Sequence, residues 1–356
     1  MSRIVHVVGT GTIGEPLIGM LTDFADKMDI DEVSFHKRTP LATDRAKINH
    51  LMVRGAKLAA DEGVRAGFEE LGHEVSYTTQ EALERASVII DCTPSGNVQK
   101  EEVYQHLSST QGFLAQGSEF GFGKPYARGV NDDVLDAEQD RFIQIVSCNT
   151  HNITTLVKTL CQRSEGSDDY MLDSANFVCI RRANDVTQTA KYVPSPSVGR
   201  HGDPTFGTHH ARDAHELFKT QGLDLNLFSS ALKVNTQYMH SIWFSVRVTE
   251  DTSVDEVVDR LKSNPRVAVT DKLDANLIFS FGRDHGYYGR ILSQTVVALP
   301  TLAVRDKREI YGFCFTPQDG NSLLSSIAAT LWRMEPDWDV VQEQLQPISR
   351  WLYREI

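Results

Sequence analysis

One cysteine lies where the sequence predicts the end of a strand and the start of a helix. The run Phe142 to Ser147 has the apolar character of a buried strand, and Cys148 follows it directly. A helix N-terminus stabilises negative charge, so we expect this position to lower the pKa of the thiol. Because the thiolate is the form that attacks carbonyl carbon, Cys148 is a candidate nucleophile. From this pattern alone, a small buried core cysteine is an equally good interpretation.

The remaining thiols favour packing roles. Cys161, Cys179 and Cys314 lie in apolar runs, and Cys92 ends a short predicted strand. The five cysteines are odd in number and form no CxxC pair, which is typical of reduced thiols in a cytoplasmic protein.

A thiol that attacks an aldehyde also needs a base, and the chain has 12 histidines from which to supply one. The candidates are the pair His209 and His210, which follows a long loop, and His240, which lies in a strand-like run. Spacing alone does not choose between them. A metal site at His209 and His210 is disfavoured, because adjacent residues on a strand point to opposite faces and no nearby Cys or carboxylate pattern completes a ligand set. We therefore predict no metal.

A glycine-rich turn near the start of the chain has the spacing GxGxxG. It directly follows an apolar strand and opens a helix, which is the context in which this pattern binds a dinucleotide. The glycines allow a tight turn, a close approach of the pyrophosphate and close packing of helix on strand, while the helix N-terminus attracts phosphate. The residues concerned are Gly9, Gly11, Thr12, Ile13 and Gly14.

The end of the second predicted strand indicates which dinucleotide. NAD enzymes usually place an acidic residue there to bind the ribose hydroxyls. This chain has Lys37 and Arg38 instead, after His36. Two cations suit a 2′-phosphate, so we predict NADP as the preferred cofactor, with NAD possible. A solvated basic turn is the alternative interpretation.

Strand and helix signals alternate through the first half of the chain, which predicts a mostly parallel sheet with helices on both faces. The predicted strands are 3–9, 31–35, 74–77, 87–92, 113–116 and 142–147, and the predicted helices are 13–28, 42–71, 79–86 and 98–107.

Longer strands follow, which predicts a mostly antiparallel sheet. The predicted strands are 176–181, 227–234, 241–248, 294–303 and 311–315, the helices are 152–162, 254–263, 322–333 and 338–351, and the loops are 183–208 and 281–293.

The expected fold class is therefore α/β: a Rossmann-type parallel-sheet domain plus a mostly antiparallel α+β catalytic domain. At 356 residues the chain is long enough for two domains. We expect the dinucleotide-binding domain to span 1–147 plus a returning 305–356, and the catalytic domain to span 148–304. A formal net charge of −12 argues against nucleic-acid and anionic-membrane partners. No run approaches the roughly 18 apolar residues of a membrane span.

Taken together, short blocks of the sequence resemble the archaeal-type (type II) glyceraldehyde-3-phosphate dehydrogenases. The blocks occur in the family's order over about two thirds of the chain. They are 11–14 (GTIG), Lys37, 91–94 (DCTP), 116–119 (QGSE), 147–150 (SCNT), 181–185 (RRAND), 208–213 (THHARD) and 239–240 (MH).

The resemblance implies that Cys148 is the nucleophile and His240 the base. It also implies an NAD(P)-dependent, phosphorylating oxidation of D-glyceraldehyde 3-phosphate to 1,3-bisphosphoglycerate and the reverse, with inorganic phosphate as acyl acceptor, in a homotetramer. The remaining implied contacts are Ser147, Asn149, His209 and His210 with the substrate, and Thr12, Ile13, Gly117, Ser118 and Arg182 with the cofactor.

The chain departs from the family pattern at some of these sites. His151 and Asn152 stand where the family has a second threonine, and Ser118 replaces a glycine. The C-terminal glutamine that contacts the nicotinamide is not plain, and Gln318 is the nearest candidate. Two alternatives follow: a related semialdehyde or acyl-phosphate reductase that also forms a thioester, and an NADP-binding regulator without turnover.

Overall fold

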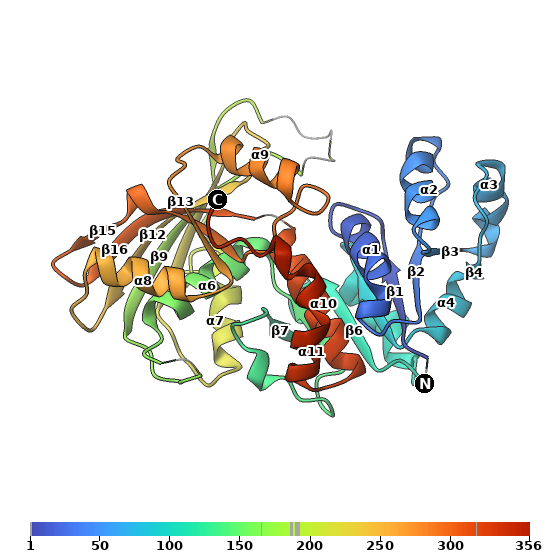
Figure 1. The fold of residues 1–356 in the computed structure, drawn as a ribbon, viewed down its shortest axis with the longest axis horizontal. Coiled ribbons are helices and arrows are strands. Elements are labelled where there is room, and N and C mark those ends of the chain that lie inside the picture. Colours follow the sequence, from blue (N-terminus) through green and yellow to red (C-terminus); the bar gives the residue numbers. More distant parts are fainter. Residues whose placement is uncertain (1, 118, 165, 186–187, 189–192, 318) are drawn as a thin grey trace. The chain divides into compact units, whose positions relative to one another are not determined.

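The computed structural model describes residues 2–356 except 118, 165, 186–187, 189–192 and 318. The chain divides into two compact units (Figure 1). The first unit comprises 1–124, 135–145 and 323–348, and the second comprises 125–134, 146–322 and 349–356. We expected the first domain to span 1–147 and 305–356, but 125–134, 146–147, 305–322 and 349–356 lie in the second unit. The chain crosses between the units several times.

The first unit contains a parallel sheet in the order β4-β3-β2-β1-β5-β6-β8, and β7 follows β8 where the chain leaves the unit. Each recorded pair from β4 to β8 is parallel. The strands are β1 (Ile4–Val8), β2 (Glu32–His36), β3 (Lys57–Ala60), β4 (Tyr77–Thr78), β5 (Val88–Asp91), β6 (Gly112–Gln116), β7 (Lys124–Tyr126) and β8 (Phe142–Ile145).

Helices connect these strands, and late segments of the chain complete the unit (Figure 1). The helices are α1 (Gly14–Asp23), α2 (Arg45–Val53), α3 (Arg65–Glu70), α4 (Thr79–Arg85), α5 (Gly96–Glu102), α10 (Gly320–Met334, from 323 onward) and α11 (Trp338–Gln344). Arg333 on α10 donates to the carbonyl oxygen of Gln111, next to β6. Helix α10 therefore packs on the parallel sheet of the first unit.

The second unit contains a mixed sheet in the order β10-β11-β9-β12-β16-β14-β13, with β15 on β16. The pairs β11–β9 and β13–β14 are parallel, and the other recorded pairs are antiparallel. The strands are β9 (Leu172–Arg181), β10 (Ser197–Val198), β11 (Leu227–Lys233), β12 (His240–Val248), β13 (Val267–Thr270), β14 (Thr295–Ala298), β15 (Ala303–Arg305) and β16 (Glu309–Thr316).

The helices of the second unit are α6 (Cys148–Cys161), α7 (His209–Lys219), α8 (Val254–Ser263) and α9 (Ala275–His285). The core joins α6 to the sheet, because Ile153 and Leu156 of α6 belong to the same buried cluster as Phe177 of β9 and Phe244 of β12. Burial alternates along β12, as expected for a strand with one buried face. The predicted fold class is confirmed. Within the described residues, no helix combines the length and apolarity that crossing a membrane requires.

Several local predictions were wrong. The predicted strand 294–303 is interrupted at Leu299–Thr301 by a 3-10 helix, and the predicted helix 338–351 ends as an α-helix at Gln344. The stretch 42–71 is not one helical region, since β3 lies inside it between α2 and α3. The loop assigned to 281–293 begins inside α9. His209 and His210 begin α7 and do not lie on a strand, so the strand argument used against a metal site there does not apply.

Candidate functional site

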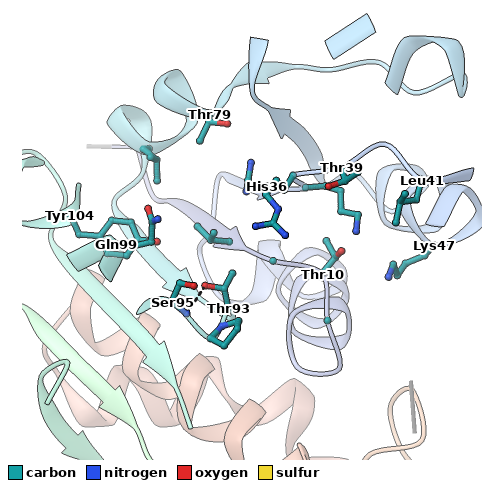
Figure 2. A pocket seen from close by; sticks show the side chains of 17 residues that line it. Thr10, His36, Thr39, Leu41, Lys47, Thr79, Thr93, Ser95, Gln99 and Tyr104 are labelled. Carbon is teal, nitrogen blue, oxygen red and sulfur yellow. Dashed lines mark hydrogen bonds between the residues drawn. The ribbon is translucent and has the colours of Figure 1, made fainter. Parts of the chain in front are cut away.

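A cavity of about 580 Å³ lies at the carboxyl ends of β1, β2 and β5 in the first unit. Figure 2 shows Thr10 from the loop after β1, His36 and Thr39 from the end of β2 and beyond, and Thr93 and Ser95 from the loop after β5. Parallel α/β sheets bind ligands at this edge, outside the carboxyl ends of the strands. Of the predicted cofactor residues, Gly9, Gly11, Lys37 and Arg38 line the cavity.

The glycine loop has the geometry that its spacing predicts. Gly9 has φ +97°, a conformation that favours glycine. A Cβ on Gly14 would lie 2.1 Å from the carbonyl oxygen of Gly9, whereas a Cβ on Gly11 would meet nothing within 4 Å. Gly14 therefore allows close packing of the first turn of α1, and Gly11 leaves its backbone bare. Thr12, Ile13 and Gly14 stand at the start of α1 and do not line the cavity.

Three cations gather on one side of the cavity. The Nζ of Lys37 lies 2.7 Å from one carboxylate oxygen of Asp44, and the Nζ of Lys47 lies 3.0 Å from the other. Burial acts to raise the pKa of Asp44, but the hydrogen bonds from Lys37 and Lys47 outweigh it and lower that pKa. With Arg38, the lining carries more positive than negative charge. Sequence reasoning missed Lys47, which α2 brings back to the turn after β2.

Gly117 follows β6 with φ +63°, and its carbonyl oxygen accepts a hydrogen bond from Gln144 at 3.3 Å. It does not line the cavity. Ser118 and Gln318 were also predicted to contact the cofactor, and both lie outside the described residues.

Cys148 is the first residue of α6 in the second unit, and Ser147 is its N-cap. The Oγ of Ser147 accepts from the backbone N–H of Thr150 at 3.3 Å, so the cap satisfies one of the open donors of the helix. The carbonyl oxygen of Cys148 accepts from the amide of Asn321 at 3.0 Å. The cysteine side chain is half-buried, whereas Cys161, Cys179 and Cys314 are buried.

The resting thiol is protonated, contrary to our expectation. Desolvation raises the pKa of Cys148 to about 11, the Asp319 carboxylate acts in the same direction, and Arg182 acts against them. The position at the helix start is as predicted, but burial and a nearby carboxylate outweigh its effect. Activation of the sulfur at neutral pH therefore requires a group that removes the proton during the reaction.

His240 is the first residue of β12 and is 7% exposed. Its Nδ1 lies 3.0 Å from the Oδ1 of Asn149, the residue after Cys148. The fold therefore brings this histidine to the first turn of α6, across 91 positions of sequence. Burial, together with the charges of Arg182 and Arg181, holds the pKa of His240 well below its usual range. The imidazole is neutral at physiological pH and can accept a proton.

His209 and His210 form the first turn of α7, with ring centroids 4.0 Å apart. His210 is 3% exposed, and neither of its ring nitrogens has a hydrogen-bond partner among the described residues. Burial lowers the pKa of both rings, and the Arg181 charge lowers them further. One buried and one exposed imidazole, a helix N-terminus and a guanidinium together suit an anion.

A second cavity, of about 470 Å³, includes Arg182, Arg290 and Asp319 among its lining residues. Arg182 lies 2.7 Å from Asp185, and Arg290 lies 3.7 Å from Asp319. Asp319 has φ +66°, which is rare for a residue with a side chain. Sequence reasoning did not identify Arg290 or Asp319. Among the residues that the structure describes, no group of three His, Cys, Asp or Glu side chains is arranged to hold a metal ion.

The first unit is of the Rossmann nucleotide-binding type, because it has a parallel sheet, a glycine-rich turn and a cavity at the carboxyl ends of β1, β2 and β5. The same chain contains a second unit with a mixed sheet and a cysteine at the start of a helix. Comparison with curated proteins identifies the family: the chain belongs to the archaeal glyceraldehyde-3-phosphate dehydrogenases. No family model matches it.

The glyceraldehyde-3-phosphate dehydrogenase of Methanobacterium bryantii is 30% identical over 274 residues, which cover 74% of this chain and 73% of that protein. The enzyme of the same name from Methanothermus fervidus is 25% identical over 352 residues, 95% of each chain. That of Metallosphaera sedula is 26% identical over 315 residues, 85% of this chain and 84% of that protein.

Proposed function

We propose that this chain catalyses the NADP-preferring, phosphorylating oxidation of D-glyceraldehyde 3-phosphate to 1,3-bisphosphoglycerate, and the reverse. The first unit serves as the dinucleotide-binding domain and the second as the catalytic domain. The observation that carries the proposal is the placement of neutral, buried His240 3.0 Å from Asn149, next to a half-buried cysteine at the start of α6.

Cys148 carries the acyl group. His240 takes the thiol proton as the sulfur forms a bond to the aldehyde carbon, and gives it to the carbonyl oxygen, which makes a thiohemiacetal. His240 then accepts the hydroxyl proton while a hydride leaves the same carbon, and a thioester remains. General-base help of this kind contributes about 100- to 10,000-fold to the rate. Inorganic phosphate attacks the thioester, the carbon–sulfur bond breaks, and the sulfur is reprotonated as the acyl phosphate leaves.

The N-terminus of α7 is proposed to hold the substrate phosphate. His210 is buried with two ring nitrogens that have no described partner, and Arg181 supplies positive charge. Ser147 and Asn149 line the approach to the sulfur in this proposal, because they flank Cys148 in the chain.

The first cavity fits a phosphorylated dinucleotide. Gly11 offers bare backbone to a pyrophosphate, and Lys37, Arg38 and Lys47 offer cations to a 2′-phosphate. A bound nicotinamide cofactor supplies the acceptor for the hydride. Arg182 and Gly117 remain further proposed cofactor contacts.

The function is tested with purified protein, D-glyceraldehyde 3-phosphate, NADP and phosphate. Cys148→Ser should abolish NADPH formation and leave NADP binding intact, and His240→Asn should reduce kcat at least about 100-fold. Cys92→Ser is the matched control, because Cys92 is also half-buried. A fully active Cys148→Ser protein rejects the proposal. Omitting phosphate separates the phosphorylating reaction from direct hydrolysis of the thioester.

The cofactor is tested by comparing kcat/KM with NADP and NAD. Lys37→Met should raise the KM for NADP by about 10- to 100-fold, as expected for one charge-assisted hydrogen bond, and change the KM for NAD little. Lys57→Met, an exposed lysine on β3, is the control. A wild-type preference for NAD overturns this part of the proposal.

We also propose a homotetramer on the basis of the family resemblance, and a cytoplasmic location on the basis of an odd number of cysteines without a CxxC pair. Light scattering of the purified chain measures the assembly, and a monomer at micromolar concentration contradicts it.

A further inference from the structure

Hydrogen bonds connect four polar or thiol side chains to His240. Asn149 and Asn152 are three residues apart on α6, so they share one face of the helix. Cys314 and Thr316 are two residues apart on β16, so they share one face of the strand. Thr316 is also the cross-strand partner of His240. The end of the β12–β16 ladder thus meets the first turns of α6 through these five side chains.

The distances form a continuous chain of hydrogen bonds. The Cys314 thiol donates to the Oδ1 of Asn152 at 3.3 Å, and the Nδ2 of Asn152 donates to the Thr316 hydroxyl at 3.0 Å. The Thr316 hydroxyl donates to the Oδ1 of Asn149 at 3.3 Å. That same oxygen lies 3.0 Å from the Nδ1 of His240.

All four supporting side chains are buried, with at most 1% of any of them exposed. Water therefore does not compete for these groups. This chain of hydrogen bonds has a polarity, because the Asn152 amide and the Thr316 hydroxyl each donate on one side and accept on the other.

The thiol end favours one polarity, since the Oδ1 of Asn152 at 3.3 Å is a nearer acceptor for the thiol than the carbonyl oxygen of Ile242 at 3.7 Å. If both amides were turned over, the Asn152 N–H would have to donate to the Cys314 sulfur, which is a weak acceptor. With the amides as they stand, the strong acceptor Oδ1 of Asn152 faces the thiol. The Oδ1 of Asn149 then faces His240, and a carbonyl oxygen can only accept. In this polarity the Nδ1 of His240 is the donor.

We propose that Cys314, Asn152 and Thr316 are positioning residues that hold His240 in the tautomer with its proton on Nδ1, which leaves the lone pair on Nε2 as the base. The inference rests on the proposed role of His240 in deprotonation. Asn152 lies in the stretch that departs from the family pattern.

The tautomer is measured directly by NMR on the full-length protein labelled with ¹⁵N-histidine. Long-range ¹H–¹⁵N correlations distinguish protonated from unprotonated ring nitrogens, and His240→Asn identifies the signal. We expect a protonated Nδ1 and an unprotonated Nε2 at pH 7.5. A protonated Nε2 with an unprotonated Nδ1 overturns the proposal, whether or not the enzyme is active.

Thr316→Val interrupts the chain of hydrogen bonds with little change in side-chain volume. We expect a mixture of His240 tautomers, a kcat reduced about tenfold and an unchanged KM for the aldehyde; Thr316→Ser keeps a hydroxyl and should restore both readouts. Thr154→Val is the control, because Thr154 is buried on α6 and donates only to backbone carbonyls of its own helix.

The outcomes separate two failures. If Thr316→Val keeps a single Nδ1–H tautomer and full kcat, the positioning role is wrong. If His240→Asn is fully active, the proposed function is wrong. The NMR result still reports the direction of the hydrogen bonds between Cys314 and His240. Should Thr316→Val fail to fold, Asn152→Asp supplies the second variant: it removes the Nδ2 donor to Thr316, and unchanged tautomer and kcat contradict the proposal.

Discussion

Lys37 and Asp44 form an ion pair of 2.7 Å at the edge of the first cavity, and the same carboxylate also holds Lys47 at 3.0 Å. One acidic residue thus offsets part of the positive charge that faces the proposed 2′-phosphate. This carboxylate orients both lysines and at the same time weakens the field that they present.

Asp44→Asn should therefore tighten NADP more than NAD. Removing one negative charge near the cavity strengthens its attraction for a 2′-phosphate, and we expect the KM for NADP to fall about threefold at low salt while that for NAD stays constant. The difference should shrink as ionic strength rises. Glu70→Gln, an exposed change on α3, is the control. An equal effect on both cofactors would contradict the assignment of this side of the cavity.

Two glycines of the same loop should respond differently to alanine. At Gly14 the new Cβ would lie 2.1 Å from the Gly9 carbonyl oxygen, so Gly14→Ala should lower the free energy of unfolding by about 1–3 kcal/mol. At Gly11 the space is open, so Gly11→Ala should leave the melting temperature unchanged and weaken cofactor binding. Calorimetry and cofactor titration measure the two effects. Unchanged cofactor affinity in Gly11→Ala would mean that nothing approaches this backbone.

The Cys148 thiol should react slowly with iodoacetamide at pH 7 and faster as the pH rises, because its pKa is about 11. Asp319→Asn removes a charge that raises this pKa. A lower pKa gives more thiolate at pH 8, so alkylation there should become faster. Asp306→Asn is the matched control, since Asp306 also has a positive φ but lies in an exposed turn. An equal alkylation rate in Asp319→Asn and wild type contradicts an effect of the Asp319 charge on the pKa of Cys148.

Acid should destabilise the protein through His6. This buried ring lies 2.8 Å from the Ser34 hydroxyl, and burial lowers its pKa to about 3. Between pH 6.5 and about 3 the unfolded chain binds one more proton than the folded chain, so the free energy of unfolding falls by about 1.4 kcal/mol per pH unit. The contribution is complete above pH 6.5 and is lost on acidification. Urea unfolding at pH 7 and 5 should show a smaller difference for His6→Asn than for wild type or for the exposed control His106→Asn.

Sequence patterns predicted elements wherever local signals agreed with the tertiary environment. The helix 254–263 was confirmed residue for residue, because Ser253 and Glu256 form a capping box. The strand β3 was missed, since Leu58, Ala59 and Ala60 favour helix intrinsically. They form a strand because β2 and β4 pair with them on either side, and this context is not visible locally.

The candidate site was predictable in part. Cys148 and the glycine loop stand at element junctions that local patterns mark. The link between His240 and Asn149 spans 91 positions, and that between Asn152 and Thr316 spans 164, so neither follows from spacing. The thiol pKa was mispredicted because the helix start was visible in the sequence, whereas burial and the Asp319 carboxylate were not.

The first unit is assembled from distant parts of the chain, and this has a consequence for biosynthesis. Gln116 on β6 bonds to Ser326 on α10 at 2.7 Å, 210 residues later, and Arg333 of α10 covers Gly112. A nascent chain that has emerged only as far as β8 lacks this cover, so one face of its sheet stays incomplete until translation is nearly finished. Ribosome-bound intermediates therefore expose apolar surface that a chaperone can bind, and a nonsense mutation before residue 323 removes the cover altogether.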